Sequence, residues 1–223
     1  MLLTISNVLD QTDLEAVRTL IDTLAWRDGK ETAGSAAKAV KQNKQADLSS
    51  RTGLELRKTL SAAIQAHPVL VAAAQPKHFS KLLISKTEAA GGYGWHIDNA
   101  FLGKGTAALR TDLSFTLFLS KPTDYEGGEL MIEHAGMTQG LKAKAGDLVL
   151  YPASSVHQVA QVISGERLAC VGWIESRIQR PDDRELLFDL TNLRADLSRA
   201  FDAQSPQLLM LNKVIANMLR RLS

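Results

Sequence analysis

The sequence predicts an α+β protein that is mainly β in its middle: an antiparallel sandwich or barrel, with helices before and after it. One observation is the succession of short apolar segments, bounded by glycine and proline, that fills residues 79–176 without a periodic segment of helix length. The other is the helical spacing of leucine, isoleucine and valine on both sides of that region. We expect these helices to cover one outer face of the β structure.

The N-terminal part is predicted to contain a strand, a helix and a polar segment. Residues 2–9 have the pattern of a short strand, and the side chains of residues 10–13 can cap a helix that ends near Trp26. Residues 27–50 are small and polar, which is typical of a loop. Such a loop is either a lid that faces a substrate or an uninformative surface loop, and the sequence leaves both readings open.

Two further helices are predicted for residues 51–74, with a break at His67-Pro68, because proline cannot continue a helix. Beyond Pro181, leucines at helical spacing predict two more helices, whose apolar faces pack in the same chain or on another subunit. Between these helical regions the strands are expected at residues 79–85, 112–119, 128–134, 138–141, 147–151, 156–163 and 167–176.

The chain length suits one domain with a short accessory piece, since 223 residues can bury a sizeable core. We expect a first unit at residues 1–177, with its β core at about 78–177, and a helical subdomain at residues 178–223.

The composition excludes several classes of partner. With 26 Lys and Arg against 24 Asp and Glu, the net charge of +2 gives no general electrostatic case for nucleic acid or membrane binding. The first residues lack a basic region followed by a long apolar run, and no long uncharged apolar stretch occurs, so a cytoplasmic address is expected. Cys170, the one cysteine, excludes an internal disulfide and suits a reducing compartment.

A glycine-rich turn at residues 91–94 leads to His96 and Asp98. Side chains two residues apart in an extended segment project to the same side, so this pair could bind one metal ion. The pair is a weak signal by itself, because two solvated polar residues at a strand end would have the same spacing. A third ligand would be needed to make the site specific.

His157 is the candidate third ligand. It follows a proline-bearing turn at the start of a predicted strand, and about sixty residues of sheet separate it from Asp98. Two histidines and one carboxylate on one face of a ferrous ion leave three coordination positions open, which oxygen chemistry requires.

Arg167 follows His157 by ten residues, after a turn and within a predicted barrel strand. Pointing inward, its guanidinium could bind a carboxylate through two parallel hydrogen bonds. Pointing outward, it would form an ordinary surface ion pair. Its position along the chain favours neither reading.

The order His96, Asp98, His157, Arg167 resembles the Fe(II)- and 2-oxoglutarate-dependent dioxygenases of the prolyl hydroxylase type. Longer stretches are similar to the bacterial PKHD-type hydroxylases, and so is the helical tail beginning near Pro181. These stretches are residues 93–100, 110–114, 127–130 and 151–173. The resemblance therefore covers nearly the whole chain.

This resemblance implies a double-stranded β-helix, or jelly-roll, core in which His96, Asp98 and His157 hold Fe(II). It also implies that 2-oxoglutarate chelates the iron and that Arg167 binds its distal carboxylate. The implied reaction consumes O₂ and 2-oxoglutarate, releases succinate and CO₂, and hydroxylates a C–H bond of a substrate. Ascorbate, which keeps the iron ferrous, is an implied cofactor.

One departure from the family concerns the second anchor of 2-oxoglutarate. Similar eukaryotic prolyl hydroxylases carry a tyrosine about ten residues before the first histidine, where this chain has Ser85, Lys86 and Thr87. Lys86 could supply a second positive charge to the cosubstrate, and either neighbour could supply a hydroxyl.

The remaining candidates are weaker. His67, His78 and His134 are expected to be structural or exposed, and Cys170 to be a buried, inert thiol. We expect Asn99 and Asp112 to orient the metal ligands, and Trp95 to line the substrate pocket.

The sequence leaves the substrate and two other functions open. The substrate is peptidyl prolyl or lysyl, or a small molecule of iron uptake. A non-enzymatic barrel that senses iron or 2-oxoglutarate would use the same ligands. A cupin-like hydrolase or isomerase with zinc or manganese would also use them, but it leaves Arg167 unexplained.

Overall fold

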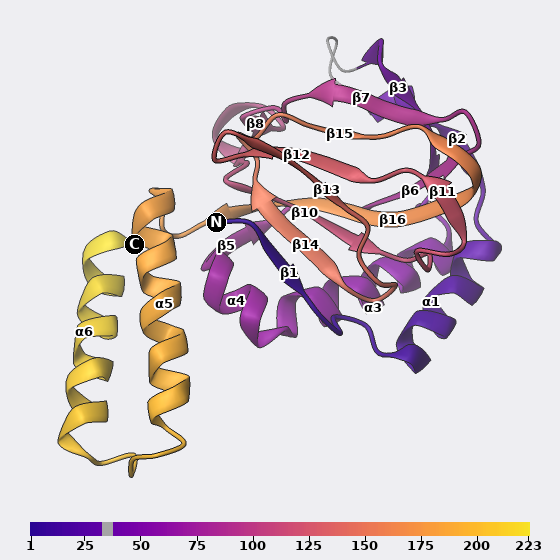
Figure 1. The fold of residues 1–223 in the computed structure, drawn as a ribbon. Coiled ribbons are helices and arrows are strands. Elements are labelled where there is room, and N and C mark those ends of the chain that lie inside the picture. Colours follow the sequence, from indigo (N-terminus) through magenta and orange to yellow (C-terminus); the bar gives the residue numbers. More distant parts are fainter. Residues whose placement is uncertain (33–37) are drawn as a thin grey trace.

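The computed structural model describes residues 1–32 and 38–223, and its two main antiparallel sheets face each other (Figure 1). A further, two-stranded sheet pairs β8 (Phe101–Leu102) with β9 (Leu109–Arg110). Within the described residues, the larger sheet has the order β1 (Leu3–Ile5), β14 (Leu148–Pro152), β10 (Leu113–Phe118), β16 (Val162–Ser176), β6 (Leu83–Glu88), β4 (Lys44–Ala46), β2 (Trp26–Asp28). Two further strands pair with β16, namely β5 (Pro76–Phe79) and β11 (Tyr125–Gly127).

The smaller sheet closes the jelly roll. Its order is β13 (Met137–Leu141), β12 (Leu130–His134), β15 (His157–Val159), β7 (Gly92–His96), β3 (Lys41–Gln42). Phe118, Ile132 and Val149 come from both sheets and form one buried apolar cluster, so the interior between the sheets is packed. The predicted fold class, a β-helix core with N-terminal helices on it, is confirmed.

Three helices pack against the outer face of the larger sheet: α1 (Gln11–Asp22), α3 (Arg51–Ala66) and α4 (Pro68–Ala74) (Figure 1). Their leucines and isoleucines share the largest buried cluster with residues of β6, β10, β14 and β16. The Asp10 and Ser50 side chains cap α1 and α3 by accepting from the backbone N–H three residues on. The helices predicted before the β region, and their break at Pro68, are confirmed.

Residues 27–50 differ from the predicted loop. They contribute β2, β3, β4 and a 3₁₀ turn at Gly29–Thr32, and β4 extends the larger sheet by pairing with β6. β3 extends the smaller sheet by pairing with β7. These strands are two or three residues long, too short for alternation to appear in the sequence, and backbone pairing with longer strands stabilises them. The part of this segment at 33–37 lies outside the described residues, so its role as a lid stays a prediction.

Two predicted strands divide differently. The strand expected at 79–85 is two strands, β5 and β6, separated by Ser80, which bonds to the backbone of Trp173 on β16. The strand expected at 156–163 ends as β15 at Val159, and β16 begins at Val162. β5 and β6 both pair with β16, whereas β15 and β16 belong to different sheets, and in neither case does periodicity alone mark the boundary.

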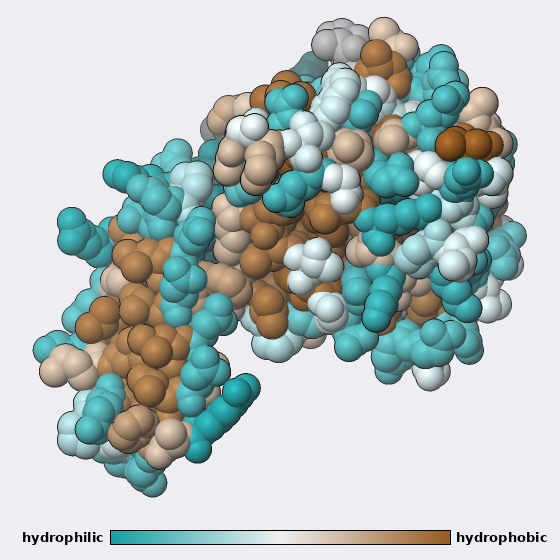
Figure 2. Space-filling view, in the orientation of Figure 1, coloured by the Kyte–Doolittle hydropathy of each residue, from teal (hydrophilic) through white to brown (hydrophobic). Residues whose placement is uncertain are grey.

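The C-terminal helices α5 (Pro181–Leu197) and α6 (Pro206–Leu222) form a hairpin that projects from the barrel (Figure 1). The expectation that helices after the β region cover its outer face is therefore wrong; α5 packs on α6 and on α4. The buried cluster of the hairpin is small, with Ile178, Leu187 and Ile215 as its fully buried members. Figure 2 shows apolar residues running along the hairpin between hydrophilic flanks. The division of the chain at residue 177 stays a prediction.

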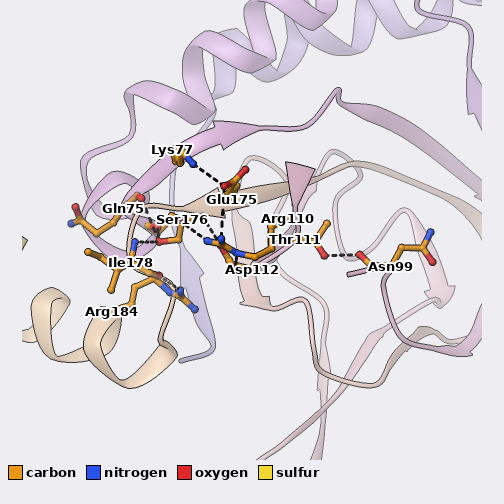
Figure 3. A network of polar contacts seen from close by, with 11 residues as sticks. Gln75, Lys77, Asn99, Arg110, Thr111, Asp112, Glu175, Ser176, Ile178 and Arg184 are labelled. Carbon is orange, nitrogen blue, oxygen red and sulfur yellow. Dashed lines mark hydrogen bonds and ion pairs between the residues drawn. The ribbon is translucent and has the colours of Figure 1, made fainter. Parts of the chain in front are cut away.

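A polar network joins the end of β16 to the start of the hairpin (Figure 3). Asp112 accepts two hydrogen bonds of 2.8 Å from Arg110 and one of 2.8 Å from the backbone N–H of Ser176. The Ser176 hydroxyl donates to the carbonyl of Ala74 at the end of α4. Arg184, on α5, donates to the carbonyl of Ile178 at 2.7 Å. The hairpin is thus attached to the barrel by buried hydrogen bonds.

Candidate active site

His96 and His157 are directly opposite each other in the ladder between β7 and β15. The register shifts between His157 and Val159, an irregularity that commonly redirects side chains in antiparallel sheets. The two imidazole centroids are 4.2 Å apart, and Nε2 of His157 lies 3.8 Å from Oδ2 of Asp98. One ligand atom from each of the three residues lies within 4.8 Å of the others, close enough to bind one metal ion.

Each ligand candidate is oriented by a hydrogen bond. Nδ1 of His96 donates to the carbonyl of Gly94 at 2.8 Å, and Nδ1 of His157 donates to that of Ser155 at 3.0 Å. These bonds leave both Nε2 atoms as electron-pair donors for a metal. Oδ2 of Asp98 accepts a 2.6 Å hydrogen bond from the hydroxyl of Ser114 on β10.

The electrostatics of the site keep His96 neutral. The pKa of His96 is lowered to about 4, mainly by burial and also by the neighbouring His157, while the carbonyl of Gly94 and the carboxylate of Asp98 oppose the shift. A neutral imidazole is the form that binds metals.

The three residues line a pocket of about 120 Å³ between the sheets, and Arg167 lines the same pocket. Arg167 is 2% exposed, so its guanidinium points inward, and the outward alternative is excluded. Within the described residues, its Nε and Nη2 atoms are buried without a hydrogen-bond partner. Burial lowers its pKa, although the nearby Tyr125 and Tyr151 oppose the shift. An unpaired buried guanidinium is costly, and an anion would remove that cost.

Lys86 is not brought to this pocket. Its Nζ pairs with Glu166 at 3.3 Å and lies 4.2 Å from the centroid of the Trp26 ring. Ser85 and Thr87 alternate with Lys86 along β6, so they point to the opposite face and line the pocket. The two hydroxyl residues, rather than the lysine, are therefore placed to meet a ligand.

The other candidates differ in how far their surroundings match the expectation. Asp112 bonds to Arg110 and Ser176, so its carboxylate does not orient a metal ligand in the described contacts (Figure 3). The backbone carbonyl of Asn99 accepts from the hydroxyl of Thr111, and Asn99 lines the pocket, so the expected role of its side chain stays a prediction. His78 is exposed, and Cys170 is fully buried as expected. His67 and His134 are half-buried.

Comparison with known proteins gives the family. The family model of the 2OG-Fe(II) oxygenase superfamily matches residues 82–175. A PKHD-type hydroxylase of Hyphomonas neptunium is 49% identical over 219 residues, which cover 98% of each chain. The chain belongs to the PKHD-type hydroxylases. It is accordingly a 2-oxoglutarate-dependent dioxygenase, of a family whose cofactors are iron and 2-oxoglutarate.

Solved structures support the fold of this PKHD-type hydroxylase. A Trichoplax adhaerens prolyl hydroxylase, in complex with a peptide fragment of a hypoxia inducible factor, has a TM-score of 0.60 at 16% identity and aligns over 80% of this chain and 85% of its own. HygX of Streptomyces hygroscopicus, with nickel, 2-oxoglutarate and hygromycin B bound, has a TM-score of 0.55 at 12% identity, over 77% and 81%. At these identities the likeness concerns the fold alone.

Sequence reasoning missed three residues of the hydroxylase's pocket. Ser114 lies within the family-like stretch 110–114, and nothing local in the sequence marks it as the partner of Asp98. Lys41 is 5% exposed and lines the pocket, although it belongs to the segment predicted to be a loop. Tyr151 is buried with its ring centroid 5.1 Å from that of His157. A buried lysine and tyrosine could have been suspected only from the pairing of β3 and the position of β14.

Proposed function

We propose that His96, Asp98 and His157 hold Fe(II) and that Arg167 binds the distal carboxylate of 2-oxoglutarate. The enzyme then hydroxylates a C–H bond of its substrate and releases succinate and CO₂. The observation that carries this proposal is the convergence of the three ligand atoms within 4.8 Å in the pocket that Arg167 also lines. Ascorbate, as the reductant that keeps the iron ferrous, belongs to the same proposal.

The donor set fits iron. Two imidazoles with free Nε2 atoms and one carboxylate form the facial arrangement typical of ferrous oxygenases, which leaves positions for a 2-oxo acid and O₂. The bound iron would supply the oxidative chemistry. The chain's own part is to orient the ligands through the carbonyls of Gly94 and Ser155 and the hydroxyl of Ser114.

The carboxylate anchor also fits. Arg167 brings a charge into a site where Phe115, Leu130 and Val171 provide apolar walls, so a bound carboxylate would be held by strong, poorly screened hydrogen bonds. The guanidinium is also 5.1 Å from the centroid of the Phe118 ring, which limits its freedom.

Anaerobic spectroscopy tests the iron site. Adding Fe(II) and 2-oxoglutarate should produce the visible charge-transfer band of a chelated 2-oxo acid, and air should then yield succinate. Asp98→Ala should abolish both, whereas Asp189→Ala, which removes an exposed carboxylate on α5, should change neither. Absence of the band in the unmodified protein, or an unchanged band in Asp98→Ala, would reject the proposal.

Arg167→Ala tests the anchor. We expect 2-oxoglutarate to bind at least about tenfold more weakly, because the variant loses hydrogen bonds between two charged groups, while metal affinity is retained. Arg167→Lys separates charge from geometry, since lysine keeps the charge but not the planar fork. Equal affinity for 2-oxoglutarate in the unmodified protein and Arg167→Ala would remove this residue from the assignment.

The substrate is the least determined part of the proposal. A peptidyl prolyl or lysyl group and an iron-uptake-related small molecule are both compatible with the pocket. We propose to incubate the iron-loaded enzyme with fractionated cell extract and 2-oxoglutarate and to search for a mass gain of one oxygen. The Asp98→Ala protein serves as the control, and only mass gains that do not occur with this variant are assigned to the enzyme.

The same experiments distinguish the proposed hydroxylase from the alternative functions. A sensing barrel would bind iron and 2-oxoglutarate without producing succinate, and a zinc or manganese hydrolase or isomerase would not need 2-oxoglutarate.

No helix among residues 1–32 and 38–223 is both long and apolar enough to cross a membrane. The absence of a nucleic acid partner and the cytoplasmic address stay predictions from the sequence.

A further inference from the structure

Tyr125 and Arg167 are two buried polar side chains whose polar atoms are incompletely paired. Within the described residues, the Tyr125 hydroxyl and the Nε and Nη2 atoms of Arg167 have no hydrogen-bond partner of standard geometry. The hydroxyl and the guanidinium nevertheless attract each other: Arg167 opposes the rise that burial causes in the pKa of Tyr125. Buried polar groups without partners are rare and costly, so this pair requires an explanation.

The strand register explains why the two residues meet. β11 pairs with β16 so that Tyr125 lies opposite Gly165, and Arg167 lies two residues further along β16 on the same face. Gly165 has a φ of +80°, and a Cβ atom there would lie 2.1 Å from the carbonyl oxygen of Asp124. Only glycine suits this position, and it lets the backbone of β16 lie close to the backbone of Asp124 and Tyr125.

The Tyr125 ring is held firmly. Gly128 lies close to it, since a Cβ atom there would be 3.0 Å from Cε2 of the ring. Nζ of Lys142 lies 4.1 Å from the ring centroid and donates to the Tyr125 carbonyl at 2.7 Å. A tyrosine that serves only as core packing would not require its hydroxyl to be buried beside a charge. The fixed ring presents that hydroxyl at a defined position.

Arg167 lines the pocket and Tyr125 does not. We propose that Tyr125 is a positioning residue for the cosubstrate: its hydroxyl oxygen accepts an N–H of Arg167 and holds the guanidinium toward the distal carboxylate of 2-oxoglutarate. The inference rests on the proposed function, because it takes Arg167 as the carboxylate anchor. Tyr125 would thus place a tyrosine at this anchor from β11, whereas Ser85, Lys86 and Thr87 lie on β6.

The test is a comparison of two 2-oxo acids on manganese-loaded protein, in which binding is measured by calorimetry without turnover. 2-Oxoglutarate carries the distal carboxylate, and 2-oxopentanoate has a methyl group in its place. Tyr125→Phe keeps the ring and removes only the hydroxyl. We expect it to bind 2-oxoglutarate about tenfold more weakly, the effect of one hydrogen bond to a charged group, and to bind 2-oxopentanoate unchanged.

Each of the other possible results would reject one part of the proposal. Equal affinity of Tyr125→Phe and the unmodified protein for 2-oxoglutarate rejects the role of the hydroxyl, and so does an equal loss for both acids. An unmodified protein that binds both acids equally rejects the proposed anchor itself. The double variant Tyr125→Phe/Arg167→Ala should bind no more weakly than Arg167→Ala, because Tyr125 acts through Arg167; additive losses would show that it does not.

Discussion

At the scale of single residues, the candidate metal site depends on two local hydrogen bonds and on one that comes from another strand. Ser114 on β10 donates to Asp98 over a distance of 2.6 Å, while the two histidines are fixed by carbonyls two residues before them. The local bonds follow from the chain near each histidine. The bond to Asp98 requires the folded sheet.

Ser114→Ala tests the importance of that bond. Without the hydroxyl, Asp98 loses its orienting donor, and we expect the affinity for Mn(II) or Fe(II) to fall by about 10- to 100-fold, the usual cost of removing such a partner. Ser176→Ala is the matched control, since it removes another buried serine hydroxyl, the one at the end of β16 that donates to the carbonyl of Ala74, and should leave metal affinity unchanged. Metal titration of both variants decides, and equal affinities would contradict the expected role.

Lys41 gives a pH dependence of stability. Burial lowers its pKa to about 8 from an ordinary 10.5, although Asp28 and Asp98 oppose the shift. Between these two values the unfolded chain binds the proton and the folded protein does not, so this lysine makes stability rise with pH over that window. Below about pH 8 both states are protonated, and the contribution is constant.

Urea unfolding of the metal-free protein at several pH values checks this. The difference in unfolding free energy between the unmodified protein and Lys41→Met should grow in favour of the unmodified protein from about pH 8 to about pH 10.5. Lys44→Met, which removes an exposed lysine of β4, serves as the control and should not produce this trend. Parallel curves for the unmodified protein and Lys41→Met would contradict the prediction.

At the scale of elements, β16 organises the molecule. Its 15 residues pair with β10 on one side and with β6, β11 and β5 along its length, and they carry Arg167 inward. Gly172 lets the strand pass the Phe115 ring, because a Cβ atom there would lie 2.6 Å from Cζ of that ring. The strand therefore joins Arg167, the proposed carboxylate anchor, to the main apolar core.

Cys170 reports on the integrity of β16. The thiol is fully buried, and burial raises its pKa, so the reactive thiolate is scarce and inaccessible. A chromogenic thiol reagent should leave the native protein unmodified at about pH 8 and react with one thiol per chain in denaturant. Rapid stoichiometric labelling of the native protein would show that this strand opens, and Cys170→Ala gives the background.

At the scale of the whole molecule, the α5–α6 hairpin presents an apolar face that the barrel does not cover (Figure 2). Large apolar side chains are exposed on both helices: Leu186, Leu193, Leu209, Met210 and Val214. α5 carries five carboxylates and two arginines, whereas α6 carries one lysine and two arginines and no acid. The opposite charges of the two helices suit the placement of each α5 on the α6 of a second copy, as a symmetric, self-complementary interface requires.

The expected homo-oligomer is tested by light scattering on the eluting protein. We expect the unmodified chain to associate at micromolar concentration and the double variant Leu193→Glu/Met210→Glu to be monomeric, since charges would be buried in the apolar face. Met137→Glu, at an equally exposed apolar residue of the barrel, is the control and should keep the oligomer. A monomeric unmodified protein would show that the hairpin does not join copies.

The sequence by itself determined the features that depend on local order. The spacing of His96 and Asp98, the position of Arg167 after His157, and the helices broken at Pro68 are readable because periodicity, capping and proline act within a few residues. The order of these motifs also sufficed to name the family, which comparison then confirmed. The metal and anchor roles of these residues stay predictions.

Only the tertiary structure decided which residues meet. Strand alternation allowed Arg167 to point either way, and the closure of the two sheets turned it inward. The pairing of β4 with β6 turned Lys86 away from the pocket and Ser85 and Thr87 toward it, and the pairing of β11 with β16 placed Tyr125 beside Arg167. The physical reason is that strand pairing joins residues many positions apart, and a two- or three-residue strand has no sequence pattern of its own.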